Sequence, residues 1–251
     1  MRSLFLLAAT LTGLASTPAA AQFSRCSDFF LEGRAPVVGQ ASPEQRRELC
    51  FSEFAVLHSG QAKTPILVAY KLNRERLEAA RAIKRRDRFY EEARLPARER
   101  ATLADYKSRL QEDGQAVRFD RGHMAPAAIM TTRAGMAQSF SLANMVPQAP
   151  RNNQGIWANA VEGATRQYAA RAKGDVYVIT GSHFGPGARR LGPSQVWVPT
   201  HLYKLVHDAA TGRSWAYWVE NSDSARMSKP IDYAELVRRT GIDFLPRPAA
   251  R

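Results

Sequence analysis

The pattern of hydrophobic and polar positions along the chain predicts strands and helices that follow one another. Thr64–Leu72 is an apolar run, which is typical of a strand. Three further runs, at residues 175–180, 196–206 and 214–219, also indicate strands. Thr and Gly at positions 211–212 predict a turn between the last two of them.

Three segments are expected to be helical. Residues 96–110 and 154–173 are the longer two, and the second is followed by Gly174, a residue type that commonly ends helices. A short helix is expected at residues 233–239, with Gly241 just past its end. Because these elements follow no regular βαβ spacing, the pattern predicts an α+β fold in a single domain.

The first 21 residues have the features of a secretory signal peptide. Arg2 gives a positive start, residues 4–14 are largely apolar, and three alanines at 19–21 precede the expected cleavage. A mitochondrial presequence is the alternative, but it would be Arg-rich and amphipathic. No later apolar run reaches a membrane-spanning length, so we expect no membrane span and a periplasmic or secreted location.

The two cysteines of the chain lie in the first part of the expected mature protein. We expect residues 22–60 to form an N-terminal extension and residues 61–251 to form the main domain. In an oxidising compartment Cys26 and Cys50 would pair, with a stabilising effect of roughly 3 kcal/mol. Two free thiols or a metal site are the alternatives, but no nearby pair of histidines supports zinc.

The charge of the chain points to an anionic partner. Its 36 Lys and Arg residues exceed its 23 Asp and Glu residues by 13, and loss of Arg2 with the signal would leave +12. Such a balance attracts polyanions and supports phosphate contacts that do not depend on base sequence. Residues 81–88 include four arginines and one lysine, which form either a solvated helix face or a phosphate-binding segment.

Two short blocks carry the candidate chemistry. The first is Asp120–His123, with the sequence Asp-Arg-Gly-His, which combines an acceptor, a cation and a candidate base. The second contains Asn144, Asn153 and Trp157. Its amide oxygens suit a hard divalent cation.

Together these blocks resemble the DNA/RNA non-specific endonucleases of the ββα-metal superfamily. The resemblance extends over roughly residues 50–246. It implies two strands and a helix within a mixed or antiparallel sheet flanked by helices. It also implies that His123 is the general base and that Asn153 binds Mg²⁺, with Mn²⁺ as a possible substitute. In the family the metal-binding Asn stands four residues before a Trp, and Asn153 has this position relative to Trp157.

The other members of the first block have supporting roles under this resemblance. Arg121 can form a forked contact with phosphate, and Gly122 is expected to let the backbone turn sharply. Asp120 is expected to fix the local geometry, or else to pair with Arg121 or Arg118. The other four histidines are interpreted as structural: His58, His183, His201 and His207.

Two asparagines have simpler alternative roles. Asn153 could be a helix N-cap, since Asn is among the residues favoured there. Asn144 matches a family Asn that supports the site, and its alternative is a turn residue before Pro147.

A Glu–Arg pair further along the chain departs from the family spacing. Glu162 and Arg166 resemble a family pair that touches the water shell of the metal, although an ordinary surface pair is the alternative. Glu162 follows Asn153 by nine residues, where the family usually has eight. On an α-helix nine residues leave the two side chains about 180° apart. We therefore predict a one-residue π-bulge, or an equivalent distortion, between residues 157 and 161.

The family also uses an upstream Arg to contact phosphate. Arg85 is the best match, and Arg81, Arg86 and Arg88 are alternatives.

The sequence therefore predicts an exported, Mg²⁺-dependent endonuclease that cleaves DNA and RNA and leaves 5′-phosphate ends. A basic nucleic-acid-binding protein without catalysis is one alternative, but it would need neither the Asp-Arg-Gly-His block nor Asn153. A phosphodiesterase acting on a small phosphate ester is the other alternative. The net charge favours a long polyanion over a small ester.

Overall fold

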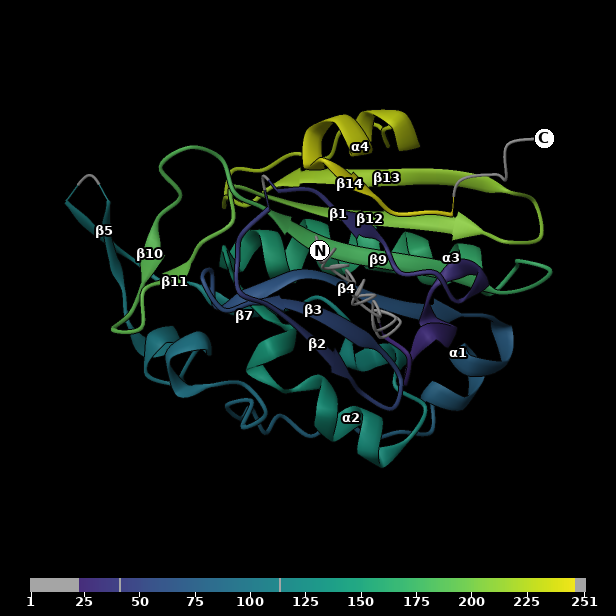
Figure 1. The fold of residues 1–251 in the computed structure, drawn as a ribbon, viewed down its shortest axis with the longest axis horizontal. Helices are drawn as coiled ribbons and strands as arrows, with labels where there is room; N and C mark the ends of the chain where they lie inside the picture. Colours follow the sequence, from purple (N-terminus) through teal and green to yellow (C-terminus); the bar gives the residue numbers. More distant parts are fainter. Residues whose placement is uncertain (1–22, 41, 113, 247–251) are drawn as a thin grey trace, which may run out of the picture.

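The computed structural model describes residues 23–40, 42–112 and 114–246, and the expected signal peptide lies outside these ranges. At its centre is a six-stranded antiparallel sheet in the order β13-β12-β9-β4-β3-β2 (Figure 1). Its strands are β2 (Arg46–Cys50), β3 (Ala55–Ser59), β4 (Thr64–Leu72), β9 (Val176–His183), β12 (His201–Asp208) and β13 (Arg213–Glu220).

Shorter elements surround this sheet. Four two-stranded ribbons pair β1 (Val37–Val38) with β14 (Ile242–Asp243), β5 (Leu110–Glu112) with β6 (Gln115–Val117), β7 (Asp120–His123) with β8 (Met145–Gln148), and β10 (Arg190–Leu191) with β11 (Val196–Trp197). The helices are α1 (Arg74–Ala80), α2 (Arg133–Ser139), the π-helix η7 (Asn152–Gly163), α3 (Ala164–Ala169) and α4 (Tyr233–Thr240). Single 3₁₀ turns occur at η1 (Ser27–Phe29), η2 (Leu31–Gly33), η3 (Ala97–Glu99), η4 (Asp105–Lys107), η5 (Ala127–Ile129) and η6 (Leu142–Asn144).

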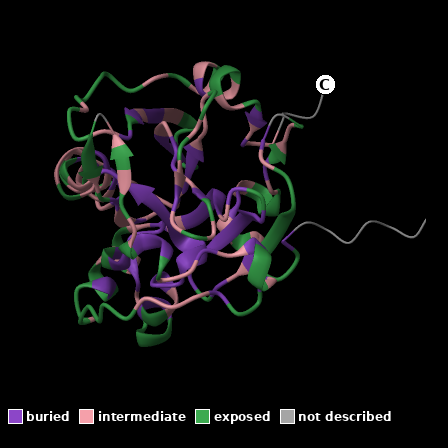
Figure 2. Cartoon of the chain, turned by 90° about the vertical axis from the view of Figure 1, so that its left-hand side faces the viewer, coloured by how far each residue is buried: buried purple, intermediate pink, exposed green. Residues whose placement is uncertain are grey.

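The sheet is hydrophobic on both faces, so each face needs a covering layer. One face packs against α1, α2, η7 and α3 through side chains such as Met136 and Trp157. The other packs against α4, the N-terminal turns and β14 through side chains such as Phe30 and Leu236. Figure 2 shows the buried strands inside an exposed outer layer. No helix among the described residues is long and apolar enough to cross a membrane.

The predicted strands are confirmed, with one correction. The run at residues 196–206 was expected to be one strand, but it forms β11 and then β12. Pro199 lies between them, and a proline has no N–H to donate to a ladder, so the strand breaks there.

The helix predicted at residues 233–239 is confirmed as α4. The Asp232 side chain accepts a hydrogen bond from Glu235 N at its start, and Gly241 ends it with φ of +66°.

The helix predicted at residues 96–110 is wrong. The segment contains the 3₁₀ turns η3 and η4 and, at Leu110, the start of β5. Its polar side chains bond elsewhere: the Asp105 carboxylate accepts from Thr102 N and Ser194 N, and Glu99 pairs with Arg47 of β2. Such bonds compete with helix formation, and the segment is held by contacts distant in sequence.

The segment expected as an N-terminal extension shares the sheet with the rest of the chain. Within residues 22–60, β2 and β3 are hydrogen-bonded in series to β4. Residues on both sides of position 61 therefore build one hydrophobic core.

The expected disulfide is present. Cys26 and Cys50 are bonded, with their Cα atoms 5.6 Å apart and 24 positions apart in sequence. The bond ties the start of η1 to the end of β2, so it anchors the first described turns to the sheet.

We predict that replacing Cys26 and Cys50 with alanine lowers the free energy of unfolding by roughly 3 kcal/mol, because the unfolded chain gains loop entropy. Urea denaturation followed by circular dichroism measures this change. Reduction of the wild-type protein should produce a similar loss. An unchanged denaturation midpoint in both experiments would contradict the prediction.

Candidate active site

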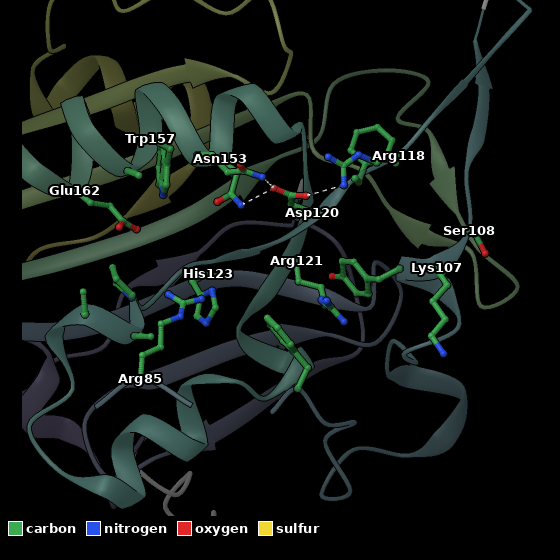
Figure 3. A pocket seen from close by; sticks show the side chains of 18 of the residues that line it. Arg85, Lys107, Ser108, Arg118, Asp120, Arg121, His123, Asn153, Trp157 and Glu162 are labelled. Atoms are coloured by element: carbon green, nitrogen blue, oxygen red, sulfur yellow. Dashed lines mark hydrogen bonds and ion pairs between the residues drawn. The ribbon is translucent and has the colours of Figure 1, made fainter. Parts of the chain in front are cut away.

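A cavity of about 630 Å³ opens between β7, the first turns of η7 and the loop before β5 (Figure 3). Most of the residues singled out from the sequence line it. They are Arg85, Asp120, Arg121, His123, Asn153, Trp157 and Glu162. Of the four basic candidates for a phosphate contact in residues 81–88, Arg85 is the one that lines this cavity. Asn144 and Arg166 are not among the residues that line it.

The ladder between β7 and β8 sets the position of His123. His123 is the last residue of β7 and pairs with Met145, while Gly122 pairs with Val146. The expected sharp turn at Gly122 is wrong, since this residue lies inside the strand without a positive φ. Glycine is needed for another reason: an added Cβ would lie 2.7 Å from the Cβ of the buried Gln148.

Asn144 fixes the chain just after His123. Its Oδ1 accepts from Ala125 N at 2.8 Å, and its Nδ2 donates to Ala125 O and Ser139 O at 2.9 Å each. The residue is fully buried, and its backbone carbonyl accepts from Met124 N. Asn144 therefore positions the backbone beside His123 without reaching the cavity.

The surroundings of His123 keep its imidazole neutral. The ring packs edge-on to Phe140, with centroids 5.0 Å apart, and Nε2 is buried without a hydrogen-bond partner among the described residues. Burial, followed by the charges of Arg85 and Arg121, lowers the pKa of His123 to about 3. The neutral ring therefore has a nitrogen free to accept a proton.

Asp120 orients the first turn of η7. Its Oδ2 accepts from Asn153 Nδ2 at 3.1 Å and from Gln154 Nε2 at 2.7 Å (Figure 3). An ion pair with Arg118, at 4.0 Å, adds to these bonds. The N-cap role considered for Asn153 is wrong: Arg151 occupies that position, and Asn153 N donates to Ala149 O, just before the helix.

Buried amides join the start of η7 to the central sheet. Gln148 Nε2 donates to Asn152 Oδ1 at 2.7 Å, and Asn152 Nδ2 donates to Glu220 O at 2.6 Å. Asn221, just after β13, accepts from Ala149 N and donates to Pro147 O. The start of η7 is therefore hydrogen-bonded both to β8 and to the end of β13.

The predicted helical distortion is confirmed and is longer than one residue. All twelve residues of η7 are π-helical. Bonds from residue i to i+5 widen the turn to about 4.4 residues, so nine residues complete about two turns. Glu162 consequently lies on the same side as Asn153 and lines the cavity.

Glu162 is set among cationic groups in a buried environment. Its Oε2 lies 3.6 Å from Arg166 NH1, and its side chain is 13% exposed. Burial raises the pKa of Glu162, while Lys204, Arg166 and the Trp157 N–H oppose this rise.

Lys204 is a fully buried cation of β12 that was not among the residues predicted from the sequence. Its Nζ donates to Tyr70 OH and Thr180 Oγ1 at 2.8 Å each, and it lies 5.2 Å from the centre of the Trp157 ring. Burial lowers the pKa of Lys204, and the charge of Glu162 opposes that shift. A lysine between the apolar residues 202–203 and 205–206 was the available signal.

Phe89 is a second residue that the sequence did not indicate. Arg121 lies over its ring, with the guanidinium carbon 4.0 Å from the ring centre, and the His123 ring is 5.8 Å away. No motif marked Phe89. It supports the Arg121 side chain beside the cavity by a cation–π contact.

The cavity is rich in positive charge. Arg85, Arg118, Arg121, Lys107 and Arg109 all line it. Among these, only Arg85 and Arg118 form ion pairs with carboxylates of the described residues, Asp87 and Asp120. The cavity is therefore suited to an anion.

The donor set fits a cation that keeps most of its waters. No group of three or more His, Cys, Asp or Glu side chains in the described part of the chain could hold a metal ion. The Oδ1 of Asn153, however, accepts no hydrogen bond from any described residue and points toward the cavity (Figure 3). A neutral oxygen of this kind suits Mg²⁺, which binds through few protein ligands.

Comparison with known proteins gives a consistent result. The profile of a family described as DNA/RNA non-specific endonuclease matches residues 33–251. Mitochondrial endonuclease G of Homo sapiens is 32% identical over 218 residues, covering 79% of this chain and 69% of that protein.

Two other relatives match over shorter stretches. The enzyme of the same name from Bos taurus is 32% identical over 186 residues, which are 65% of this chain and 57% of that protein. Nuclease C1 of Cunninghamella echinulata var. echinulata is 37% identical over 141 residues, or 52% of each chain. The chain thus spans between about half and 69% of the length of these three relatives.

A solved structure has the same fold. A chain in the crystal structure of the EndoG/EndoGI complex superposes with a TM-score of 0.65 and 23% identity, covering 81% of this chain and 87% of that one.

We predict that Gly122→Ala lowers the free energy of unfolding by about 1–3 kcal/mol, because the added methyl group would overlap Gln148. Gly174→Ala is the matched control, since its Cβ would lie 3.7 Å from that of Ala210, an ordinary contact. Thermal denaturation of both variants tests this. Equal melting temperatures for the two would contradict the packing constraint.

Proposed function

Because the chain belongs to the DNA/RNA non-specific endonuclease family, we propose that it is a metal-dependent endonuclease that hydrolyses phosphodiester bonds in DNA and RNA. One observation carries the proposal. The neutral imidazole of His123 and the unpaired Oδ1 of Asn153 line the same cationic cavity.

His123 acts as the general base in this proposal. Its ring stays neutral well below pH 7, and the residue lines the cavity. A water in the cavity, beside the face of the imidazole that lines it, can lose its proton to the ring as its oxygen attacks phosphorus. Attack of this kind, with the 3′ oxygen as leaving group, gives 5′-phosphate ends.

Asn153 would hold the metal through Oδ1, and Glu162 would accept hydrogen bonds from metal-bound waters. A bound Mg²⁺ would stabilise charge that develops on the phosphate and the leaving oxygen. Asp120 keeps the Oδ1 of Asn153 directed to the cavity, and Arg166 restrains the Glu162 carboxylate. Mn²⁺ has the same preference for oxygen ligands.

Arg121 and Arg85 would bind the phosphate. Both guanidinium groups lie over aromatic rings, Arg121 over Phe89 and Arg85 over Phe140. Contacts to phosphate read neither the base nor the 2′-hydroxyl. This accounts for activity on both DNA and RNA.

We also propose that the enzyme is exported to the periplasm or the medium. The N-terminal segment has signal-peptide features, and the disulfide between Cys26 and Cys50 is a bond typical of oxidising compartments.

The two rival functions each lack support from the site. A protein that only binds nucleic acid would not need a neutral His123 beside Asn153 in the same cavity. An esterase for a small phosphate would not need the many cations along the cavity.

We predict that His123→Ala reduces plasmid and RNA cleavage by about 10²–10⁴-fold, because the general base is lost. Agarose gels with and without EDTA measure both the rate and the need for metal. His207→Ala is the control, since His207 bonds Ser214 outside the cavity. Wild-type cleavage by a folded His123→Ala protein, or cleavage that persists in EDTA, would refute the proposal.

We predict that Asn153→Ala raises the Mg²⁺ concentration needed for half-maximal cleavage by at least tenfold, because the protein ligand is lost. Gln154→Ala is the neighbouring control, which removes the other amide bonded to Asp120. Metal titration of cleavage rates distinguishes them. The same metal requirement in both variants would rule out Asn153 as the ligand.

A further inference from the structure

The basic segment at residues 84–90 separates two cavities. Arg85 and Phe89 line the catalytic cavity, and Asp87 forms an ion pair with Arg85 at 2.5 Å. The residues that alternate with these three line a second groove: Lys84, Arg86, Arg88 and Tyr90. Alternate residues of one segment therefore form a common wall of both cavities.

The second groove has an apolar floor and a cationic rim. Its volume is about 780 Å³. Ala82, Ile83 and the α2 residues Met136 and Ala137 supply apolar surface. Arg133, at the first position of α2, adds a fourth cation from a different element.

The charges of this rim are not neutralised within the protein. Lys84, Arg86, Arg88 and Arg133 are all exposed, and none forms an ion pair with a described carboxylate. Arg85 differs, since its charge is partly balanced by Asp87. Four unpaired cations around one groove favour a polyanion there.

We propose that this groove binds the nucleotides that flank the cleaved bond of a polynucleotide substrate. Phosphates of the flanking strand would contact the four cations, and a base would lie on the apolar floor beside Tyr90. Grooves that combine cations with apolar or aromatic surface bind single strands in this way. The inference rests on the proposed function, because it names a longer stretch of the same substrate.

The shared wall is the reason for choosing a polynucleotide over a separate ligand. A strand bound to Arg85 in the catalytic cavity needs only to cross residues 84–90 to reach Arg86 and Arg88. A small phosphate would occupy one rim cation and leave the others unpaired. A long anion uses the whole groove.

The test measures binding, so that it does not depend on catalysis. In a His123→Ala background, a fluorescent 20-nucleotide DNA strand is titrated with protein carrying Arg86→Gln and Arg88→Gln. We expect affinity to fall on the order of tenfold and the slope of log K against log salt to flatten by about 1.4 units, since each contact to a single strand contributes about 0.7. Arg133→Gln should weaken binding as well, although Arg133 lies on a different element.

The matched control removes the same charge elsewhere. Arg226 and Lys229 are exposed, form no ion pair with described residues and line neither cavity. The Arg226→Gln, Lys229→Gln protein should bind the 20-nucleotide strand within twofold of its parent. A loss equal to that of the groove variants would show a general charge effect and overturn the proposal.

A length series gives the second criterion. A dinucleotide fits within the catalytic cavity alone, so the groove variants should bind it within twofold of their parent. Equal losses for the dinucleotide and the long strand would mean that Arg86 and Arg88 act in the catalytic cavity, which overturns the groove. If the wild-type protein cleaves no nucleic acid, the proposed nuclease function fails. The groove proposal is judged separately, by the binding data.

Discussion

A single carboxylate, Asp120, determines which atom of Asn153 faces the cavity. An ionised carboxylate can only accept hydrogen bonds, so it must take the nitrogen end of the Asn153 amide. The oxygen end is then directed to the cavity, and a reversed amide would place two acceptors against each other. The same contact joins the first residue of β7 to the first turn of η7, and so fixes the distance between strand and helix.

Other polar groups make this arrangement rigid. Buried amides of Asn144, Gln148, Asn152 and Asn221 bond to backbone or to one another at the joints of β7, β8 and η7. Each bond contributes about 1 kcal/mol net, but a buried amide that loses its partner costs more than that. Such a network tolerates few rearrangements, so the positions of His123 and Asn153 are held by the same set of bonds.

The sequence indicated the central strands and the site better than it indicated the regions between them. Apolar runs predicted β4, β9 and β13, because burial in a sheet requires them. The nine-residue interval between Asn153 and Glu162 predicted a one-residue π-bulge or an equivalent distortion, since an α-helix would separate the two side chains. This inference needed the family spacing of eight residues as well as the interval in this chain.

The failures share a physical cause. Residues 96–110 are shaped by bonds to β2 and to Ser194, partners far along the chain that a local pattern does not contain. Phe89 and Lys204 belong to the site only through packing in three dimensions. Gly122 was linked to a turn because glycine often serves there, whereas its actual constraint is the side chain of Gln148 on a neighbouring strand.

The alternation of side chains along residues 84–90 has a consequence for how this segment can change in length. Insertion of one residue between positions 85 and 89 would put the two ends of the segment out of step, so that Arg85 and Phe89 could no longer both line the cavity of His123. Insertion of two residues would restore the original facing. The segment is therefore subject to a parity rule, under which even changes of length preserve both surfaces and odd changes disrupt both at once.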